Sequence, residues 1–354
     1  MIRVGLFLPF QSDHWPSIER FARVLQAGAL QSGREELSLV PVRPNESWKQ
    51  NYGDFLGRRV AYTLGSFWQD FDVYHILDQS YSHLALAWPA DRVLITCHDL
   101  EFWRKKNMKN AIVRRWILKA MLKADYLTTP SKTVESEVLE TARLFKKIPF
   151  SSQVIYNSCG SEFGGLGKKK NTEKNLGRPV VLNIANTHWP RKNFSFLLGV
   201  ISGLKKSIPD ILLKQVGPEF TSEHRREIKD LKLETNIQRM QQLKPSEIAA
   251  EYAAAWLYLQ PSTYEGFGYP LLECVASGTP FLASKIPVFE ELFPVEGSLL
   301  ELDLNLWVER SRELLSQNEN CRQTLEAQRI NNLRFSEAEQ VRQYLELYET
   351  ISKN

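Results

Sequence analysis

Short apolar runs alternate with helical patterns along nearly the whole chain, and this alternation constrains the fold more than any other feature. A run of about five apolar residues is typical of a strand buried on both faces of a parallel sheet. The expected strands form two series, Val4–Leu8, Val73–Leu77, Val93–Cys97, Tyr126–Thr129 and Val154–Tyr156, then Val180–Ala185, Ile211–Val216, Trp256–Gln260 and Pro280–Ala283. The sequence therefore predicts an α/β protein built on parallel sheets.

The alternation stops over residues 164–177, which contain four glycines and a run of lysines. Such a segment is typical of a linker, and 354 residues exceed what one hydrophobic core usually supports. We therefore predict two domains and a separate C-terminal helix. The predicted parts are a first domain at 1–165, a linker at 166–178, a second domain at 179–335 and a helix at 336–354.

Two carboxylates eight positions apart bracket a glycine-containing loop that follows the expected strand Trp256–Gln260. Glu265 lies at the carboxyl end of that strand, where ligands bind in open α/β sheets. Pro270 suits the first turn of a helix, and Glu273 lies one turn into that helix. The glycines in 266–268 allow close approach of the backbone, and free amides at a helix start attract phosphate. The segment therefore predicts a phosphate site next to carboxylates that accept hydrogen bonds from sugar hydroxyls.

This segment resembles the E-x7-E motif of retaining glycosyltransferases of family 4, which have the GT-B architecture. The resemblance implies that Glu265 contacts the donor sugar and that Glu273 binds the nucleotide ribose. It also implies that the loop amides of Gly266, Phe267, Gly268 and Tyr269 hold the diphosphate. An ordinary strand–turn–helix with two solvated acids is the alternative. The GT-B architecture implies two Rossmann-like domains facing a central cleft, with the C-terminal helix crossing back to the first domain.

A histidine follows the expected central strand Val93–Cys97 of the first domain. Neutral histidine can both donate and accept a hydrogen bond, so His98 is a plausible partner for a ligand at this edge. The segment Cys97–Leu100 is similar to a family run whose histidine contacts the donor sugar. A structural histidine is the alternative, and for Asp99 we favour a capping role.

Adjacent cations precede an expected helix in the second domain. Arg191 and Lys192 lie in a segment similar to the family's G-x-x-x-P-R-K-N run, in which the lysine is a diphosphate ligand. Arginine and lysine donate strong hydrogen bonds to phosphate oxygens. The sequence departs from the family at Asn186, where glycine is usual, and at Thr187, where arginine is frequent. A solvated Arg-Lys pair is the alternative.

The first loop lacks a feature that many family members have. Residues 9–17 contain no glycine, so either Gln11–Asp13 replaces the usual contact with the donor phosphate or that contact is lost. Asp70-Phe71-Asp72 superficially matches a metal-binding D-x-D motif, but it precedes a strand and we interpret it as a polar strand entry. In the second domain, Gly217 and 237–241 are expected near the nucleotide base.

Basic residues are concentrated between Arg104 and Lys123, with apolar residues at helical spacing among them. A basic amphipathic helix can lie on an anionic membrane surface, which would favour a lipid-linked acceptor. A solvated helix packed by its apolar stripe, including Trp116 and Met121, is an equally plausible alternative.

Composition narrows the class of protein further. A net charge of +4 is too small to indicate a nucleic-acid partner, and no run of about 18 apolar residues is present. The four cysteines are far apart, which fits a reducing cytoplasm and argues against structural zinc. No G-x-G-x-x-G follows a first strand, which argues against a dinucleotide-dependent oxidoreductase.

The sequence therefore predicts a cytoplasmic, metal-independent, retaining glycosyltransferase of the hexosyltransferase class. A peripheral position at the inner face of the membrane is the further expectation from the basic segment. It would transfer a sugar from a nucleotide diphosphate sugar to a saccharide or lipid-linked acceptor, in bacterial polysaccharide or glycolipid biosynthesis. No cofactor is expected. A non-catalytic nucleotide-sugar-binding or scaffold protein of the same fold is the alternative.

Overall fold

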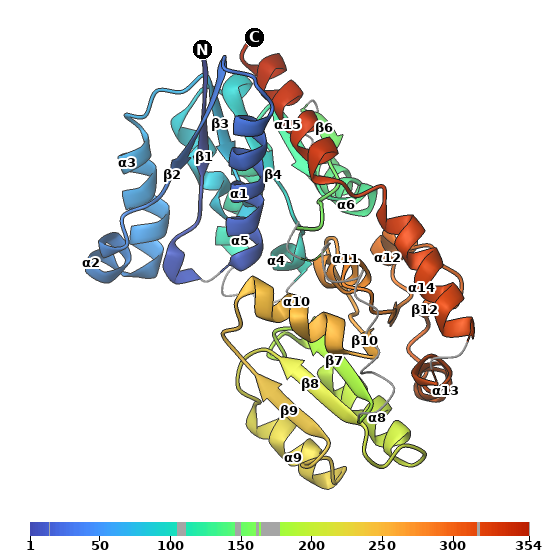
Figure 1. Ribbon diagram of the computed structural model, residues 1–354. Helices are drawn as coiled ribbons and strands as arrows, with labels where there is room; N and C mark the ends of the chain where they lie inside the picture. The colour runs from blue at the N-terminus through green and yellow to red at the C-terminus, as the bar shows by residue number, and fades with distance from the viewer. Residues whose placement is uncertain are drawn as a thin grey trace. The chain divides into compact units, whose positions relative to one another are not determined.

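The computed structural model describes residues 1–13, 15–104, 111–145, 150–160, 163, 178–316 and 319–353 (Figure 1). The chain divides into two compact units, and the first is built from two separate segments. Unit 1 comprises Met1–Asn157 and Ser336–Asn354, and unit 2 comprises Ser158–Phe335. The boundary falls just after Asn157, whereas residues 166–177 of the predicted linker lie outside the described residues.

Unit 1 contains a six-stranded parallel sheet in the order β2-β1-β3-β4-β5-β6. Its strands are β1 (Ile2–Phe7), β2 (Leu37–Val42), β3 (Val73–Ile76), β4 (Val93–Thr96), β5 (Tyr126–Thr129) and β6 (Ser151–Val154). The helical elements are η1 (Gln11–Asp13), α1 (Pro16–Gln31), α2 (Ser47–Leu56), η2 (Gly57–Ala61), α3 (Tyr62–Ser66), η3 (Gln79–Ala87), η4 (Ala90–Arg92), α4 (Glu101–Arg104), α5 (Ala111–Met121), α6 (Lys132–Leu144) and α15 (Glu337–Ile351).

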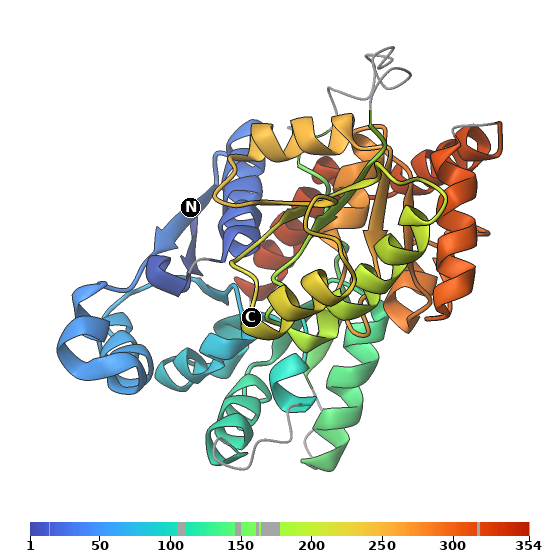
Figure 2. The same cartoon turned by 90° about the horizontal axis from the view of Figure 1, so that it is seen from below.

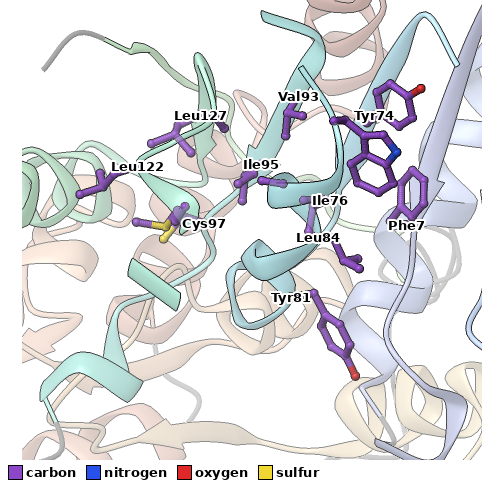
Figure 3. Close-up of a cluster of buried hydrophobic side chains, with 14 of the residues drawn as sticks. Phe7, Tyr74, Ile76, Tyr81, Leu84, Val93, Ile95, Cys97, Leu122 and Leu127 are labelled. Carbon is purple, nitrogen blue, oxygen red and sulfur yellow. The ribbon is translucent and has the colours of Figure 1, made fainter. Parts of the chain in front are cut away.

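Among the described residues of unit 1, two buried clusters lie against the sheet, which fits a sheet covered on both faces. One is an aromatic and aliphatic cluster of side chains from β1, β3, β4, β5 and the segments α3, η3, α5 and α6 (Figure 3). The other cluster joins the sheet to α1 and α15, which lie side by side in Figure 1 and Figure 2. The expectation that the C-terminal helix packs on the first domain is confirmed.

A buried polar network fixes α15 on this sheet. His75 lies between the hydroxyls of Tyr348 and Thr96, at 2.7 Å from each. Burial lowers the pKa of His75 to about 3, so its ring is neutral and donates from one nitrogen while accepting at the other. The Tyr344 hydroxyl lies 3.1 Å from Thr128 Oγ1, which extends the network to β5. Because buried polar groups need partners, this network specifies how the helix docks.

Unit 2 contains a second six-stranded parallel sheet in the order β12-β11-β10-β7-β8-β9. Its strands are β7 (Val180–Ile184), β8 (Leu212–Val216), β9 (Ile237–Met240), β10 (Leu257–Gln260), β11 (Phe281–Ser284) and β12 (Leu299–Leu300). The helical elements are η8 (Pro190–Lys192), α8 (Phe194–Lys205), α9 (Ser222–Asp230), α10 (Pro245–Ala254), α11 (Tyr269–Ala276), α12 (Pro287–Leu292), α13 (Leu304–Leu315) and α14 (Glu319–Asn332). Apolar side chains of β7, β8, β10, β11, α8 and α13 form its main core, around the fully buried Trp307.

The expected strands match the interior of both sheets, and the errors are at the edges. The strands β2, β9 and β12 were not predicted, and β6 ends at Val154, where a strand over Val154–Tyr156 was expected. All four are edge strands, and they are less buried than most interior strands. A partly solvated strand does not need the continuous apolar run that identifies a buried one.

Candidate functional site

Two loops meet at the carboxyl edge of the second sheet, because β7 and β10 are adjacent parallel strands. The loop after β7 contains the short helix η8, and the loop after β10 leads into α11. The Thr263 N–H donates to the carbonyl of Arg191 at 2.8 Å, which joins the loops directly. This is the edge of the sheet where the sequence predicts a ligand site.

The joined loops bring both predicted cations onto one predicted carboxylate. Lys192 Nζ lies 2.5 Å from Glu265 Oε1, and Arg191 Nη1 lies 3.0 Å from Oε2. Gln260 Nε2 and Ser262 Oγ also donate to Oε1, at 2.9 and 2.8 Å. Glu265 is only 7% exposed, so this set of donors replaces water around a buried charge.

The cations of this cluster favour an anionic ligand. Burial by itself would raise the pKa of Glu265, but Lys192 and Arg191 together hold that pKa below its usual value. The carboxylate is therefore ionised at neutral pH. Lys192 and Arg191 both pair with this carboxylate, which brings two cationic side chains together at the edge of the sheet. Such side chains bind phosphate.

The second predicted carboxylate lies in α11, one turn below the loop. Glu273 is buried and accepts a 2.9 Å hydrogen bond from the hydroxyl of Tyr252 in α10. Gly268 begins this helix with φ 104°, a conformation that favours glycine, and an added Cβ would meet Phe289 at 2.6 Å. The expected proline lies in the first turn, as Pro270.

The loop side chains and the loop backbone have different environments. Gly266 and Gly268 are buried, and the ring of Phe267 packs against Tyr269 and Phe335. The Phe267 side chain therefore belongs to the core of unit 2. If this segment binds the donor, Phe267 contributes through its backbone.

Gly217 follows β8, the strand on the other side of β7, so it lies at the same edge. An added Cβ would come within 2.2 Å of the Ala185 carbonyl, so only glycine fits at this position.

The two departures from the family pattern lie in the loop after β7. Asn186 Oδ1 accepts a hydrogen bond from His188 N at 3.1 Å, and Thr187 Oγ1 is buried with no partner in the described part of the chain.

Sequence reasoning missed three supporting residues of this site, Gln260, Ser262 and Tyr252. Gln260 and Ser262 donate to Glu265, and Tyr252 donates to Glu273. The available signal was weak, since Gln260 is simply a polar residue at the end of an otherwise apolar buried strand. Tyr252 has no local signal, because its partner is 21 residues away.

His98 lies in unit 1, just beyond β4. Its Nε2–H donates to the carbonyl of Leu77 at 2.9 Å, and its ring packs edge-on against Phe21. Burial lowers the pKa of His98, so the ring is neutral. The tautomer is therefore fixed, with Nδ1 as an acceptor, and no described residue donates to that nitrogen.

The first loop is occupied by internal contacts. The Gln11 N–H donates to Glu46 Oε1 at 2.6 Å, and the Asp13 N–H donates to the Phe10 carbonyl at 3.0 Å. The carboxylate of Asp13 pairs with Arg58 and Lys49. These groups are therefore not available to replace the glycine-rich contact with a donor phosphate.

The other predicted charged features are placed as follows. Asp72 accepts a hydrogen bond from the N–H of Arg3 at 2.8 Å and lies just before β3, at the opposite end of that strand from the ligand edge. Within the described ranges, no three His, Cys, Asp or Glu side chains are grouped as a metal site would require. None of the helices in the part of the chain that the structure describes is both long and apolar enough to cross a membrane.

The basic segment is only partly described, because Lys105, Lys106 and Lys109 lie outside the described residues. In α5, Ile117, Ala120 and Met121 are buried, while Ile112 is 85% exposed. Most of the predicted apolar stripe therefore packs inside unit 1.

Comparison with solved structures identifies the architecture. The fold is similar to a sucrose-phosphate synthase from Thermosynechococcus elongatus, with a TM-score of 0.75, 17% identity and 99% of each chain covered. It is also similar to Anabaena HepE in complex with UDP and glucose, with a TM-score of 0.69, 16% identity, and 99% of this chain and 100% of that chain covered. The predicted GT-B fold is confirmed.

Part of the chain is similar to known glycosyltransferases in sequence. Residues 167–329 match the family model described as glycosyl transferases group 1. An O-antigen chain mannosyltransferase, RfbU, from Salmonella typhimurium is 28% identical over 205 residues, which are 56% of this chain and 53% of the relative. An MMP alpha-(1->4)-mannosyltransferase from Mycolicibacterium hassiacum is 30% identical over 127 residues, which are 35% and 30% of the two chains.

The chain thus spans at most about half the length of these curated relatives. The match to the glycosyl transferases group 1 model covers less than half of the chain, and the solved structures support the GT-B fold. The matched segment contains the Arg191–Lys192–Glu265 cluster and Glu273.

Proposed function

We propose that this protein is a retaining glycosyltransferase that transfers a hexose from a nucleotide diphosphate sugar to an acceptor hydroxyl. The observation that carries the proposal is the pair of cations in the Arg191–Lys192–Glu265 cluster, placed at the carboxyl edge of the second sheet beside the start of α11. The group 1 match over this segment supports it. Bacterial polysaccharide or glycolipid synthesis is the proposed setting, since one relative is an O-antigen mannosyltransferase.

The proposed chemistry depends on stabilising the departing diphosphate. Negative charge develops on that group as the glycosidic bond breaks, and preorganised cations lower the barrier. Lys192 and Arg191 are held in place by Glu265 before the donor binds, so little reorganisation is needed. In this proposal Glu265 also contacts the donor sugar and Glu273 binds the ribose. Nδ1 of His98 accepts a hydrogen bond from a sugar hydroxyl.

The test is transfer to acceptors from a panel of nucleotide sugars, preceded by thermal shifts that identify the bound donor. We propose that no metal is required, because the cations and loop amides neutralise the diphosphate. Activity should therefore survive EDTA. Complete loss with rescue by magnesium or manganese would contradict the metal-independent mechanism but not the transfer reaction. The anomeric configuration of the product tests retention.

A non-catalytic nucleotide-sugar-binding protein is a second candidate, and the first loop is the observation that favours it. The Gln11 and Asp13 amides are both committed to internal hydrogen bonds. If the missing contact is essential, the protein should bind a nucleotide sugar tightly but show neither transfer nor donor hydrolysis. Transfer above background would exclude this candidate.

We further propose peripheral contact with an anionic membrane, which would present a lipid-linked acceptor. The basic residues of α5 support this, together with exposed apolar side chains in or just after α2 and α3, namely Leu56, Leu64 and Trp68. Both α3 and α5 pack on η3 within unit 1. Co-sedimentation with phosphatidylglycerol vesicles at low salt tests the contact, with neutral vesicles as the control.

A further inference from the structure

A second polar cluster lies at the carboxyl edge of the first sheet, entirely within unit 1. At its centre Asp13 accepts two hydrogen bonds from Arg58, at 2.6 and 2.8 Å, and one from Lys49 at 2.5 Å. Arg58 also pairs with Asp54 at 2.9 Å. Two carboxylates therefore balance these two cations. Although burial works against ionisation, the cations and Tyr81 keep the pKa of Asp13 below its usual value.

Arg59, the next residue, has neutral partners instead. Its Nη1 donates to the Ser80 carbonyl and to Nδ1 of His83, the latter at 2.8 Å. The ring of His83 is neutral, because burial and the nearby Arg59 lower its pKa to about 3. Since His83 Nε2–H donates to the Arg58 carbonyl at 2.9 Å, Nδ1 is left as the acceptor for Arg59.

Asp54 and Asp78 act on Arg59 electrostatically, but no described carboxylate forms an ion pair with it. The hydrogen bonds of its side chain to described residues use a single one of its three guanidinium nitrogens. Burial lowers the pKa of Arg59 to about 10, so the group remains charged at neutral pH. A partly desolvated cation without a directly paired carboxylate is costly for a folded protein, and an anionic ligand bound to it would offset that cost.

Ser80, whose carbonyl Arg59 contacts, has a side-chain hydroxyl without a partner among the described residues. Ser80 Oγ is buried and makes no hydrogen bond to any described residue, although the carbonyl of the same residue accepts from Arg59. Ser80 lies in η3, directly after β3, at the edge where ligands bind in open α/β sheets. Figure 3 shows the ring of the neighbouring Tyr81 within the buried cluster, with its hydroxyl pointing away from the other labelled side chains.

We propose that Arg59 and Ser80 Oγ form a binding site for an oxyanion group of the acceptor, either a phosphate or a carboxylate. Guanidinium groups bind both in a bidentate manner, and a hydroxyl adds one further donor. That the oxyanion belongs to an acceptor rests on the proposed function, whereas the oxyanion site itself is inferred from the geometry of unit 1. The oxyanion belongs either to a sugar or to the diphosphate of a lipid carrier.

Calorimetric titration separates these sources. The probes are inorganic phosphate, glucose 6-phosphate, glucuronate and geranyl diphosphate, with glucose as the neutral control. Each titration contains a saturating nucleoside diphosphate, UDP or GDP, to occupy the proposed donor site of unit 2. If neither nucleotide binds, the proposed function has failed, and the probes are titrated into the Lys192→Ala variant so that the test of unit 1 continues.

We expect wild type to bind at least one oxyanion probe and to bind glucose more weakly. Arg59→Gln should weaken oxyanion binding by about tenfold or more, because a charge-assisted contact is lost, whereas Arg59→Lys should retain part of it. Ser80→Ala should weaken oxyanion binding a few-fold without lowering the melting temperature. If Arg59 and Ser80 had only a structural role, this loss of binding at unchanged stability would not occur. Arg23→Gln, at an exposed position in α1, is the matched control and should bind as wild type does. Absence of oxyanion binding by wild type, or equal affinity of wild type and Arg59→Gln, would overturn the proposal.

Discussion

The carboxyl edges of the two sheets both hold charged clusters, but the chain assembles them differently. At the second edge, Arg191, Lys192 and Glu265 follow directly from two neighbouring strands. At the first edge, Arg58 and Arg59 come from η2, a segment between β2 and β3, and they meet residues that follow β1 and β3. The first arrangement is visible as a linear motif, whereas the second exists only in the folded unit.

Despite this difference, both edges gather cations around a carboxylate. Lys192 and Arg191 pair with Glu265 at the second edge, while Lys49 and Arg58 pair with Asp13 at the first, where Arg59 follows Arg58. In our proposals the cations of the second edge serve the donor diphosphate, and Arg59 serves an oxyanion of the acceptor. The predictions below test whether the two clusters are equivalent in stability and distinct in function.

The largest effect is expected from removing the buried carboxylate of the second edge. Glu265→Ala leaves Lys192 and Arg191 without their counter-charge, and breaking a buried ion pair typically costs about 3–5 kcal/mol. Urea unfolding measures this loss. Glu313→Ala is the matched control, because the Glu313 side chain is 46% exposed and its pair with Arg310 should contribute only about 0.3–0.5 kcal/mol. Similar losses of stability for both variants would mean that the ion pairs of Glu265 contribute no more than a partly exposed pair.

The same cluster should give stability a defined pH dependence. Because the folded-state pKa of Glu265 is lowered, its contribution is fully present above the unfolded-state value, near 4.5, and is lost as pH falls through the folded-state value. The difference in unfolding free energy between wild type and Glu265→Gln should therefore be constant from about pH 6 to 8 and should shrink below about pH 4. A difference that grows as the solution is acidified would contradict the assigned pKa direction.

Removing one cation of the second edge should mainly affect the reaction. Lys192→Ala should lower the rate of transfer by about 10²–10³, the usual cost of losing one preorganised electrostatic contact in a transition state. Lys214→Ala is a suitable control, because Lys214 also pairs with a glutamate but lies within β8. If both variants lose activity equally, the effect comes from stability and not from the diphosphate.

The interior of both sheets was predictable from the sequence, and the physical reason is burial. Strands such as Val93–Thr96 and Leu257–Gln260 are buried along their whole length, so they need continuous apolar runs. Edge strands do not, and Ile237–Met240, with a glutamine and an arginine at its centre, has no such signal. Pro41 further obscures β2, although proline is tolerated at a sheet edge.

The second-edge cluster was predictable in its members but not in its contacts. Glu265, Arg191 and Lys192 each belong to a short motif next to a strand, yet neither motif indicates that the cations pair with Glu265. The Arg59 site had no signal at all. Arg59 is 21 and 24 residues from Ser80 and His83, and the packing of η2 on η3 brings it to them.

A moderate loss of nucleotide affinity is expected on removing the carboxylate of Glu273. If Glu273 accepts hydrogen bonds from the ribose, Glu273→Ala should weaken binding of the nucleoside diphosphate by about 1.5–3 kcal/mol. Tyr252→Phe keeps the carboxylate but removes the hydroxyl that orients it, so its effect should be smaller. Titration calorimetry measures both variants. Equal nucleotide affinity for wild type and Glu273→Ala would remove the ribose assignment.

The smallest loss of stability is expected in α15, the C-terminal helix that belongs to unit 1. Unit 1 is built from two segments of the chain, whereas unit 2 is continuous. Tyr348→Phe removes the 2.7 Å hydrogen bond to His75 and leaves one nitrogen of that buried ring without a partner. The expected loss is about 1 kcal/mol, the usual net value of one buried hydrogen bond. Hydrogen exchange should locate the loss in the strands of unit 1, where α15 packs, while protection in unit 2 stays unchanged. Thr350→Ala is the control, because it removes a hydroxyl from the same helix that bonds only to the Glu346 carbonyl at an exposed position. If Tyr348→Phe lowers protection equally in both units, they unfold together, and the two edges cannot be treated as independent parts of the molecule.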